Sequence, residues 1–490
     1  MSKNPIKKLA GDTAVYGLGT VVPRLLNYLL VPFYTIMVFN QSQYGQITEL
    51  YAYVAILMVL LTYGMETAFF RFANKSGNPV VIYGTAATSL LFTSTLFVVA
   101  VVLFNGKIAQ AISYSGHGTY IVLIGLIVAV DAFTSLPFAF LRFINKAKRF
   151  SFIKIANVIL NIALNFILLI IIPRLFKDTY NHFWIYKTLG LVGMVFVSNL
   201  VASLFTLLLL VPELKSFTLG IDKNILKKML SYGLPILIIG FAGMINEVSD
   251  KILLRYLLPP GVNVSAVIGV YGANYKLAIL MMLFIQMFRY AAEPFFFAES
   301  GKSDAKLIYS RVMTVFVAFC WFIFLLVMLF IDGFKYFIGR DFWVGLTIVP
   351  IVLAAKLFLG IFYNLSVWYK LTDKTLYGGL IALFGATVTI LLNIILIPSW
   401  GYIGSAWANF ACYFSMALIS YFLGKRFYKI DYDVKKISGY SFLALFIFAL
   451  SRFLNLDTTF HRIAAGFVLI SVYVLVVYIF ERKSFLNIKG

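Results

Sequence analysis

Three cationic side chains fall near the middles of long apolar segments in this 490-residue sequence, Arg24, Lys276 and Lys356, and Asp131 is an acid at a comparable depth. A charge at the centre of a bilayer costs about 2.5–3.5 kcal/mol on insertion scales, so it is expected to face a cavity or an oppositely charged partner. Arg can give a phosphate two parallel hydrogen bonds, and Lys supplies a point charge. The three cations therefore predict a site for a pyrophosphate group. The alternative is that Arg24 or Lys356 pairs with Asp131 and locks helices together.

The segment around Arg24 also has a polar face. Polar side chains recur along it at helical spacing, namely Thr20, Arg24, Asn27, Tyr28 and Thr35. A stripe of this kind on one side of a helix is expected to face water rather than lipid. Asn27 is therefore a candidate for substrate binding beside Arg24.

Three asparagines form a second stripe, Asn157, Asn161 and Asn165, spaced four residues apart. Amide side chains can replace water around sugar hydroxyls, but they also join neighbouring membrane helices for about 0.6 kcal/mol per contact. Helix packing is the favoured interpretation, and sugar contacts are the alternative.

Ionisable residues mark a candidate outer gate. Glu247, Lys251 and Arg255 follow each other at four-residue spacing, with Asp250 on the adjacent ridge. Glu four residues before Lys is the favourable order for an intrahelical pair. The group is interpreted either as structural or as a gate of exchangeable ion pairs.

Two acids are candidates for energy coupling or for counter-charges, Asp131 and Glu66. Either carboxylate could carry a proton, and the alternative is that the membrane potential alone drives a negative head group. Arg289 and Glu293, spaced i, i+4 near the end of an apolar segment, are interpreted mainly as a structural pair, because snorkelling lowers the cost of charges there.

The elements that must position these residues are membrane-spanning helices. Hydrophobic residues make up 62% of the chain and charged residues 12%, against about 25% charged residues in a soluble globular chain. Long apolar runs recur along the whole chain, which excludes a soluble enzyme tethered by one helix. We predict an all-α polytopic membrane protein with about 14 transmembrane helices, at 12–38, 43–70, 79–105, 119–144, 150–173, 183–211, 232–258, 266–292, 307–331, 343–369, 375–398, 402–424, 437–455 and 461–480.

The formal net charge is +22, from 41 Lys and Arg and 19 Asp and Glu. A nucleic-acid partner is one interpretation of such a balance, but the placement of the cations argues against it. Most Lys and Arg outside the predicted spans fall in the N-terminal tail and in loops on the same side, such as 145–154 and 425–436. This positive-inside pattern predicts that both termini are cytoplasmic.

Little in the sequence supports catalysis. Gly301-Lys302-Ser303 lacks the glycine that a phosphate-binding loop requires five residues earlier, so ATP is not expected as the energy source. The three His and two Cys show no metal-ligand or redox spacing, and the loops are too short for a catalytic domain. We predict no enzyme activity, no cofactor and no metal; a membrane glycosyltransferase or polymerase is the enzyme alternative.

The chain also repeats itself across six spans. Tyr16-Gly17-Leu18 and Tyr232-Gly233-Leu234 each open a span, and Leu164-Asn165 and Leu392-Asn393 each stand near the end of one, with a proline after them. Because six is even, the halves enter the membrane in the same direction and should be related by a pseudo-two-fold axis along the membrane normal. We predict an N-lobe at 1–211 (helices 1–6), a C-lobe at 212–424 (helices 7–12), and two further helices with a tail at 425–490.

Taken in order, the motifs resemble those of a known family. They are Ala10-Gly11-Asp12 before the first span, Gln43-Tyr44-Gly45 at the second, Tyr232-Gly233-Leu234-Pro235 at the seventh, and the run from Leu392 to Pro398 followed by Gly401 to Ala406. The chain resembles the bacterial polysaccharide flippases, which are Wzx-type oligosaccharide transporters of the multidrug/oligosaccharidyl-lipid/polysaccharide exporter superfamily. The resemblance covers nearly the whole chain.

Membership would imply two six-helix lobes around a central cavity with alternating access. The implied substrate is an undecaprenyl-pyrophosphate-linked oligosaccharide, moved to the outer leaflet of the bacterial inner membrane for O-antigen, capsule or exopolysaccharide assembly. Implied partners are this lipid, other membrane lipids and other polysaccharide-assembly membrane proteins. A lipid II flippase and a cation-coupled drug antiporter are alternatives within the superfamily, and the two extra spans with Arg24 and Lys356 argue against the antiporter.

Overall fold

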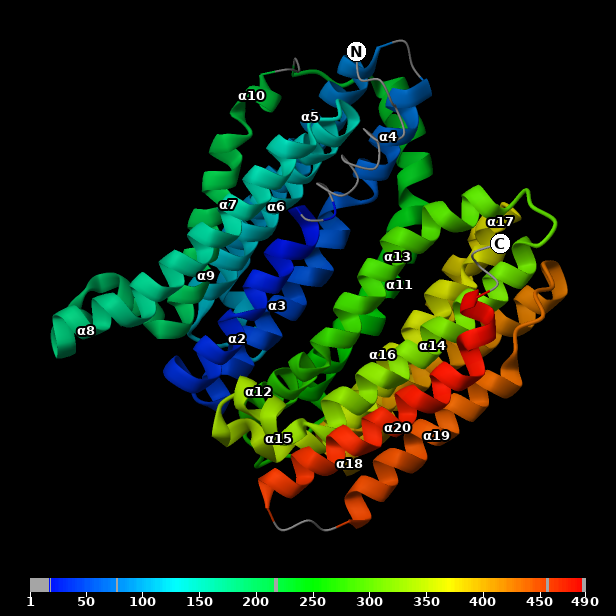
Figure 1. The fold of residues 1–490 in the computed structure, drawn as a ribbon. Coiled ribbons are helices and arrows are strands. Elements are labelled where there is room, and N and C mark those ends of the chain that lie inside the picture. Colours follow the sequence, from blue (N-terminus) through cyan, green and yellow to red (C-terminus); the bar gives the residue numbers. More distant parts are fainter. Residues whose placement is uncertain (1–16, 18, 76–77, 216–218, 455–457, 487–490) are drawn as a thin grey trace. The chain divides into compact units, whose positions relative to one another are not determined.

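The computed structural model describes residues 17, 19–75, 78–215, 219–454 and 458–486, and the regular structure of this part is helical throughout. Thirteen of its helical segments are long and apolar enough to cross a membrane. The longest, α18 (Thr375–Phe427), is broken at Gly401, whose φ of 55° separates two straight halves. Fourteen crossings result, and the predicted all-α polytopic fold is confirmed (Figure 1). The Ala10-Gly11-Asp12 motif and both chain ends lie outside the described residues.

The chain divides into two compact units, Met1–Val248 and Ser249–Gly490. The division falls inside α11 (Lys223–Leu257), and the lobe boundaries predicted after residues 211 and 424 stay predictions. The other helices of the first unit are α2 (Leu30–Pro32), α3 (Gln41–Thr62), α4 (Met65–Lys75), α5 (Pro79–Ala111), α6 (Gly118–Phe143), α7 (Ala147–Phe166), α8 (Ile172–Phe176), α9 (Trp184–Leu209) and α10 (Val211–Leu214). Those of the second unit are α12 (Val264–Tyr275), α13 (Ile279–Glu299), α14 (Ala305–Leu329), α15 (Ile331–Phe334), α16 (Val349–Leu365), α17 (Val367–Leu371), α18, α19 (Val434–Phe453) and α20 (Thr459–Leu486).

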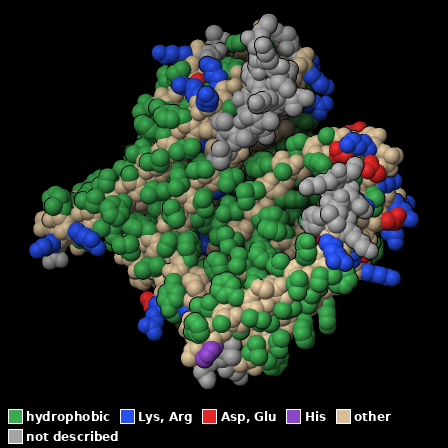
Figure 2. Space-filling model, viewed as in Figure 1, with side chains coloured by type: hydrophobic (Ala, Val, Ile, Leu, Met, Phe, Trp, Pro, Cys, Tyr) green, Lys and Arg blue, Asp and Glu red, His purple; other side chains and the backbone are tan. Residues whose placement is uncertain are grey.

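In the first unit, α6 lies at the centre of the packing and contacts α3, α5, α7 and α9. It is apolar around its circumference and mostly buried, as expected for a helix enclosed by others. The neighbouring α5 instead exposes large apolar side chains such as Phe92 and Leu103. Hydrophobic side chains also cover most of the surface visible in Figure 2, whereas Lys and Arg lie mainly near helix ends. Such an exposed apolar surface is suited to lipid.

In the second unit, α16 packs against α13, α14 and α18, and the last two helices pack against α14. Figure 1 shows α19 and α20, in orange and red, side by side along this helix. Both expose large side chains, among them Phe442 and Phe467. The two helices that the sequence places after the C-lobe therefore form a layer on the outside of this unit.

The second span bends between α3 and α4, where Tyr63 and Gly64 both have positive φ angles, 33° and 71°. A Cβ on Gly64 would lie 2.5 Å from the carbonyl oxygen of Gly233 in α11. Only glycine permits so close an approach of two backbones. The contact supplies a structural reason for the glycine in the Tyr232-Gly233-Leu234-Pro235 motif.

The two units repeat one local structure at positions that the sequence predicts as equivalent. Asn165 and Asn393 are both fully buried, and their Nδ2 atoms donate to the carbonyl four residues earlier at 2.8 and 2.7 Å. This agreement supports an internal repeat, while the axis that relates the halves stays a prediction.

Candidate functional site

Arg24 lies on the first span, Gly19–Val38, and its side chain is exposed. Its charge acts on Tyr28, one turn later, and Asn27 is exposed on the same helix. Thr35, by contrast, is buried and donates to the carbonyl of Val31 at 2.8 Å. The polar face predicted for this span is therefore concentrated around Arg24 and does not extend along the whole helix.

A second group of charges lies within the same unit, on α6 and α7. Asp131 and Lys154 are half-buried and close enough to act on each other's charge, and Arg24 also acts on Lys154. The Lys154 ammonium is 3.9 Å from the ring centroid of Phe138. The sequence predicts Arg24 or Lys356 as the partner of Asp131, whereas the structure gives it Lys154 as a cationic neighbour.

Lys154 is absent from the candidates that the sequence provides. It stands at the end of the basic 145–154 segment, which has the composition of a cytoplasmic loop, but α7 begins at Ala147 and places Lys154 two turns inside the helix. The asparagine stripe is the signal that could have found it. Lys154 precedes Asn157 by three residues and extends this stripe towards the start of the helix.

The asparagine stripe itself joins helices. Asn157 Nδ2 donates to the Ala202 carbonyl at 2.9 Å and to Thr206 Oγ1 at 2.8 Å, both on α9. Asn165 Oδ1 accepts from the Tyr34 hydroxyl at 2.7 Å. These bonds support the packing interpretation for two of the three residues, and sugar contacts stay a prediction. Asn161, which accepts from Asn165 at 3.1 Å, is half-buried.

Glu66 on α4 forms an ion pair with Arg142 on α6. Both side chains are partly exposed, and the Arg142 guanidinium lies 5.1 Å from the ring centroid of Phe70. The charges of Glu66 and Arg142 also act on Lys154. In this conformation Glu66 is a counter-charge, and a proton-carrying role requires this ion pair to open.

Lys356 lies within the second unit and has no exposed surface. Its ammonium is 4.8 Å from the ring centroid of Tyr275 and 5.0 Å from that of Tyr413. The Lys251 ammonium lies 4.4 Å from the same Tyr275 ring. One aromatic ring is thus within cation–π distance of two ammonium groups.

The candidate outer gate is divided between the units. Asp250 in the second unit is 1% exposed and accepts from Lys251 Nζ at 2.9 Å and from the Tyr271 hydroxyl at 2.6 Å. Arg255 donates to Ser265 Oγ at 2.9 Å, and Glu247 belongs to the first unit. The Asp250–Lys251 pair is a sealed ion pair rather than an exposed one, and the gate function stays a prediction.

Lys276 stands where α12 gives way to α13, in a short 3-10 segment (Lys276–Ala278), and is half-buried. No three His, Cys, Asp or Glu side chains gather as a metal site would need in the described ranges.

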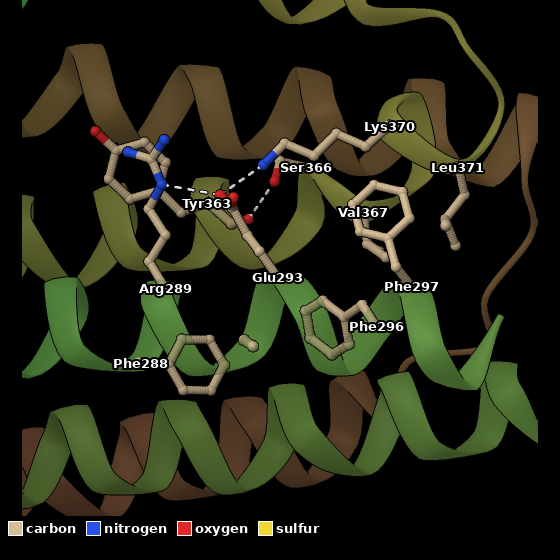
Figure 3. A pocket seen from close by; sticks show the side chains of 11 residues that line it. Phe288, Arg289, Glu293, Phe296, Phe297, Tyr363, Ser366, Val367, Lys370 and Leu371 are labelled. Carbon is tan, nitrogen blue, oxygen red and sulfur yellow. Dashed lines mark hydrogen bonds and ion pairs between the residues drawn. The ribbon is translucent and has the colours of Figure 1, made fainter. Parts of the chain in front are cut away.

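A pocket opens in the second unit between α13, α16 and α17 (Figure 3). Glu293 Oε1 accepts from Arg289 Nε at 2.9 Å and from Lys370 Nζ at 2.7 Å. The Arg289 guanidinium lies 4.8 Å from the ring centroid of Tyr363. The sequence identifies the Arg289–Glu293 pair but not Lys370, because this cation is brought in from another helix.

The fold resembles those of three solved membrane transport proteins. A lipid II flippase MurJ in an inward closed conformation matches with a TM-score of 0.68 and 14% identity, covering 96% of this chain and 100% of that one. The MATE multidrug transporter DinF-BH matches with a TM-score of 0.61 and 17% identity, covering 88% and 97%. An inward-facing multidrug resistance MATE family transporter of the MOP superfamily gives 0.58 and 14%, covering 86% and 98%. At these identities the likeness shows a common fold.

The sequence comparison identifies a family. No curated protein sequence matches the chain. The family described as "Polysaccharide biosynthesis protein" matches residues 9–299, which is more than half of the chain and includes every candidate in the first unit. The resemblance carried by the sequence motifs is confirmed at this level, and the chain belongs to the polysaccharide biosynthesis protein family.

Proposed function

We propose that this protein is a flippase that moves an undecaprenyl-pyrophosphate-linked oligosaccharide from the cytoplasmic to the outer leaflet of the bacterial inner membrane. Membership of the polysaccharide biosynthesis protein family supports the class of cargo. The fold shared with a lipid II flippase supports the transport of a lipid-linked head group. The observation that carries the proposal is the grouping of Arg24, Lys154 and Asp131 inside the first unit.

These three side chains suit a pyrophosphate head group. Counting Lys154 itself, three cations and two acids lie within electrostatic reach of its ammonium, and a pyrophosphate is a compact anion with many hydrogen-bond acceptors. Arg24 is exposed, so a ligand can reach its planar guanidinium, which can bind two phosphate oxygens at once. Lys154 adds a second positive charge to the group, while Asp131 lowers the cost of keeping that ammonium away from water.

The cations of the second unit have a different place in the proposed cycle. Lys356 is fully buried, so the Tyr275 and Tyr413 rings must separate before it can touch a head group. In an alternating-access cycle, Arg24 and Asn27 take the pyrophosphate first, and Lys276 and Lys356 line the cationic cavity in a later state. Either Asp131 or Glu66 remains the proposed counter-charge or coupling acid.

A lipid II flippase is the second candidate function. It is favoured by the TM-score of 0.68 and by the coverage of the whole MurJ chain. Its cargo has the same polyprenyl-pyrophosphate head, so the charges of the first unit fit both lipids. Only the sugar attached to the pyrophosphate separates the two candidates.

The decisive experiment identifies the lipid. Deletion of the gene should cause undecaprenyl-pyrophosphate-linked oligosaccharide to accumulate in the cytoplasmic leaflet. Mass spectrometry of extracted lipids identifies the lipid, and its protection from periodate added outside intact spheroplasts shows the leaflet. Restoration of the gene should clear it. Accumulation of lipid II would establish the second candidate, and unchanged levels of both lipids would contradict the proposed function.

The orientation has its own test. With both termini cytoplasmic, a cysteine at the exposed Lys148 position should react with a membrane-impermeant maleimide only after the cells are opened. The two natural cysteines, Cys320 and Cys412, are buried and give a low background. Labelling of intact spheroplasts would reverse the assignment.

A further inference from the structure

The pocket between α13 and α17 combines a cationic side with an apolar wall. We propose that it is a second binding site, separate from the Arg24 region, for the phosphate or pyrophosphate head group of a membrane lipid. The side chains that line the pocket support the site; only the identity of the natural lipid rests on the proposed function. The site belongs wholly to the second unit.

The cationic side has hydrogen-bond donors to spare. Arg289 uses Nε on Glu293, and its two terminal nitrogens make no hydrogen bond within the described ranges. Half of the Arg289 side chain is exposed, at 50%. Lys370 directs one donor to Glu293 at 2.7 Å, and an ammonium has three. With two cations and one acid, the pocket carries a net positive charge that a phosphate can neutralise.

The guanidinium is also held in place. It lies 4.8 Å from the ring centroid of Tyr363, and the i, i+4 bond to Glu293 fixes its direction along α13. A ligand that binds to a side chain already fixed loses less conformational entropy on binding. Figure 3 shows Arg289 and Lys370 approaching Glu293 from opposite sides.

The apolar wall is part of a rigid core. Phe296 and Val367 are buried together with Tyr309, whose hydroxyl donates to the Phe296 carbonyl at 2.8 Å. Beside them Phe297 is 52% exposed. A free anion gains no binding energy from this apolar surface, whereas a lipid can place its first chain atoms there while its phosphate contacts Arg289. The pocket is therefore assigned to a lipid-borne phosphate rather than to a soluble one.

Glu293 distinguishes a binding site from a structural ion cluster. Its carboxylate lies where an incoming phosphate oxygen would bind, so it competes with that ligand. If the pocket binds anions, removal of this charge raises the affinity for them. If the three residues only join α13 to α17, the same change weakens the fold and adds no affinity.

The test measures binding of farnesyl pyrophosphate to the purified full-length protein in detergent, by isothermal titration calorimetry, in an Arg24→Ala background so that the Arg24 region does not contribute. Glu293→Gln should tighten binding about tenfold, and Lys370→Gln and Arg289→Gln should each weaken it about tenfold, as expected for loss of one charge-assisted interaction. Glu299→Gln is the matched control, because Glu299 pairs with Lys302 near the end of the same helix and outside the pocket. It should leave the affinity unchanged. Size-exclusion chromatography identifies variants that do not fold, and Lys370→Gln serves if Arg289→Gln is lost.

Inorganic pyrophosphate and phosphatidylglycerol vesicles form the other two arms. Tighter binding of farnesyl pyrophosphate than of inorganic pyrophosphate supports a lipid-borne head group, and equal binding overturns that assignment. Unchanged or weaker binding by Glu293→Gln overturns the site, whereas displacement of farnesyl pyrophosphate by phosphatidylglycerol supports a site that accepts a lipid phosphate. Binding is measured without transport, so the two proposals can fail separately. If the deletion strain accumulates the lipid as expected but farnesyl pyrophosphate does not bind to the pocket, only the second site is overturned.

Discussion

The two units treat their interior charges differently. In the first, Arg24 is exposed and Lys154 is half-buried near Asp131. In the second, Lys356 has no exposed surface and Asp250 is 1% exposed. In the sequence, Arg24 and Lys356 look equivalent, since each stands near the middle of a span. The difference shows that depth along a helix does not determine access to a charge; the side chains that pack around it do.

This difference has an energetic consequence. An exposed guanidinium keeps much of its hydration and can exchange that water for phosphate oxygens. A buried ammonium has already lost its water and is compensated by aromatic rings, each worth about 2 kcal/mol when desolvated. An exposed cation such as Arg24 is therefore the better first contact for an exchangeable ligand, whereas Lys356 can reach a ligand only after the rings around it separate.

Arg24→Ala is expected to have the largest effect. Loss of two charge-assisted hydrogen bonds to pyrophosphate should lower transport at least about 100-fold, while the protein still inserts at normal levels because Arg24 is exposed. Arg24→Lys should restore part of the rate, since Lys lacks the two-pronged geometry. The measurement is complementation of polysaccharide export. Asn27→Ala, also at an exposed position on the same helix, should do less harm, and normal export by Arg24→Ala would refute the cationic site.

Asp250→Asn tests the buried charges of the second unit. It removes the Asp250 carboxylate that accepts from Lys251, whose side chain is 11% exposed, and loss of one partner of a buried ion pair costs about 3–5 kcal/mol of folding free energy. The unfolding temperature in detergent should fall accordingly. The double variant Asp250→Asn/Lys251→Met should recover most of the loss. If the single variant is as stable as the wild type, the ion pair is not structural.

Lys356→Met addresses the comparison directly. Methionine has a similar volume and no charge, and Lys356 is proposed to line the cavity only in a later state, so export should fall, but by less than with Arg24→Ala. Thermal unfolding and complementation are measured on the same samples as Arg24→Ala. Export at the wild-type rate, with an unchanged unfolding temperature, would show that Lys356 does not reach the substrate.

Much of the fold could be predicted from the sequence, because an apolar stretch long enough to span a bilayer has few alternatives to a helix. Even the Gly401 break, inside the 53 residues of α18, follows from a glycine that comes shortly after Pro398. The sequence also shows the repeat of Leu164-Asn165 and Leu392-Asn393, and in the structure both asparagines make the same bond to their own helix.

The site was less predictable, since it depends on contacts between helices. The favourable i, i+4 spacing suggests Glu247 as a partner of Lys251, but it does not indicate the bond that Lys251 donates to the adjacent Asp250, which also accepts from Tyr271. Lys370 joins Glu293 from a helix far along the chain. Lys154 was missed because it follows a run of basic residues that has the composition of a cytoplasmic loop. Helical spacing gives the face of one helix, and it does not give which neighbour covers that face.

The smallest expected effect comes from an ion cluster outside the spans, at Asp332 between α14 and α16. A hydrogen bond from Lys335 holds the pKa of the Asp332 carboxyl below its usual value, and Arg462 of α20 contributes in the same direction. Because the folded-state pKa is depressed, the cluster contributes stability above the unfolded pKa of about 3.9 and loses it as the pH falls through the folded pKa.

Between pH 5 and pH 3, Asp332→Asn should therefore lose less in unfolding temperature than the wild type, whereas Asp304→Asn, at an exposed position, should behave as the wild type does. Since this cluster is partly exposed to water, the difference should be well below that of Asp250→Asn. If Asp332→Asn and Asp250→Asn changed the unfolding temperature equally, burial would not set the strength of an ion pair in this protein.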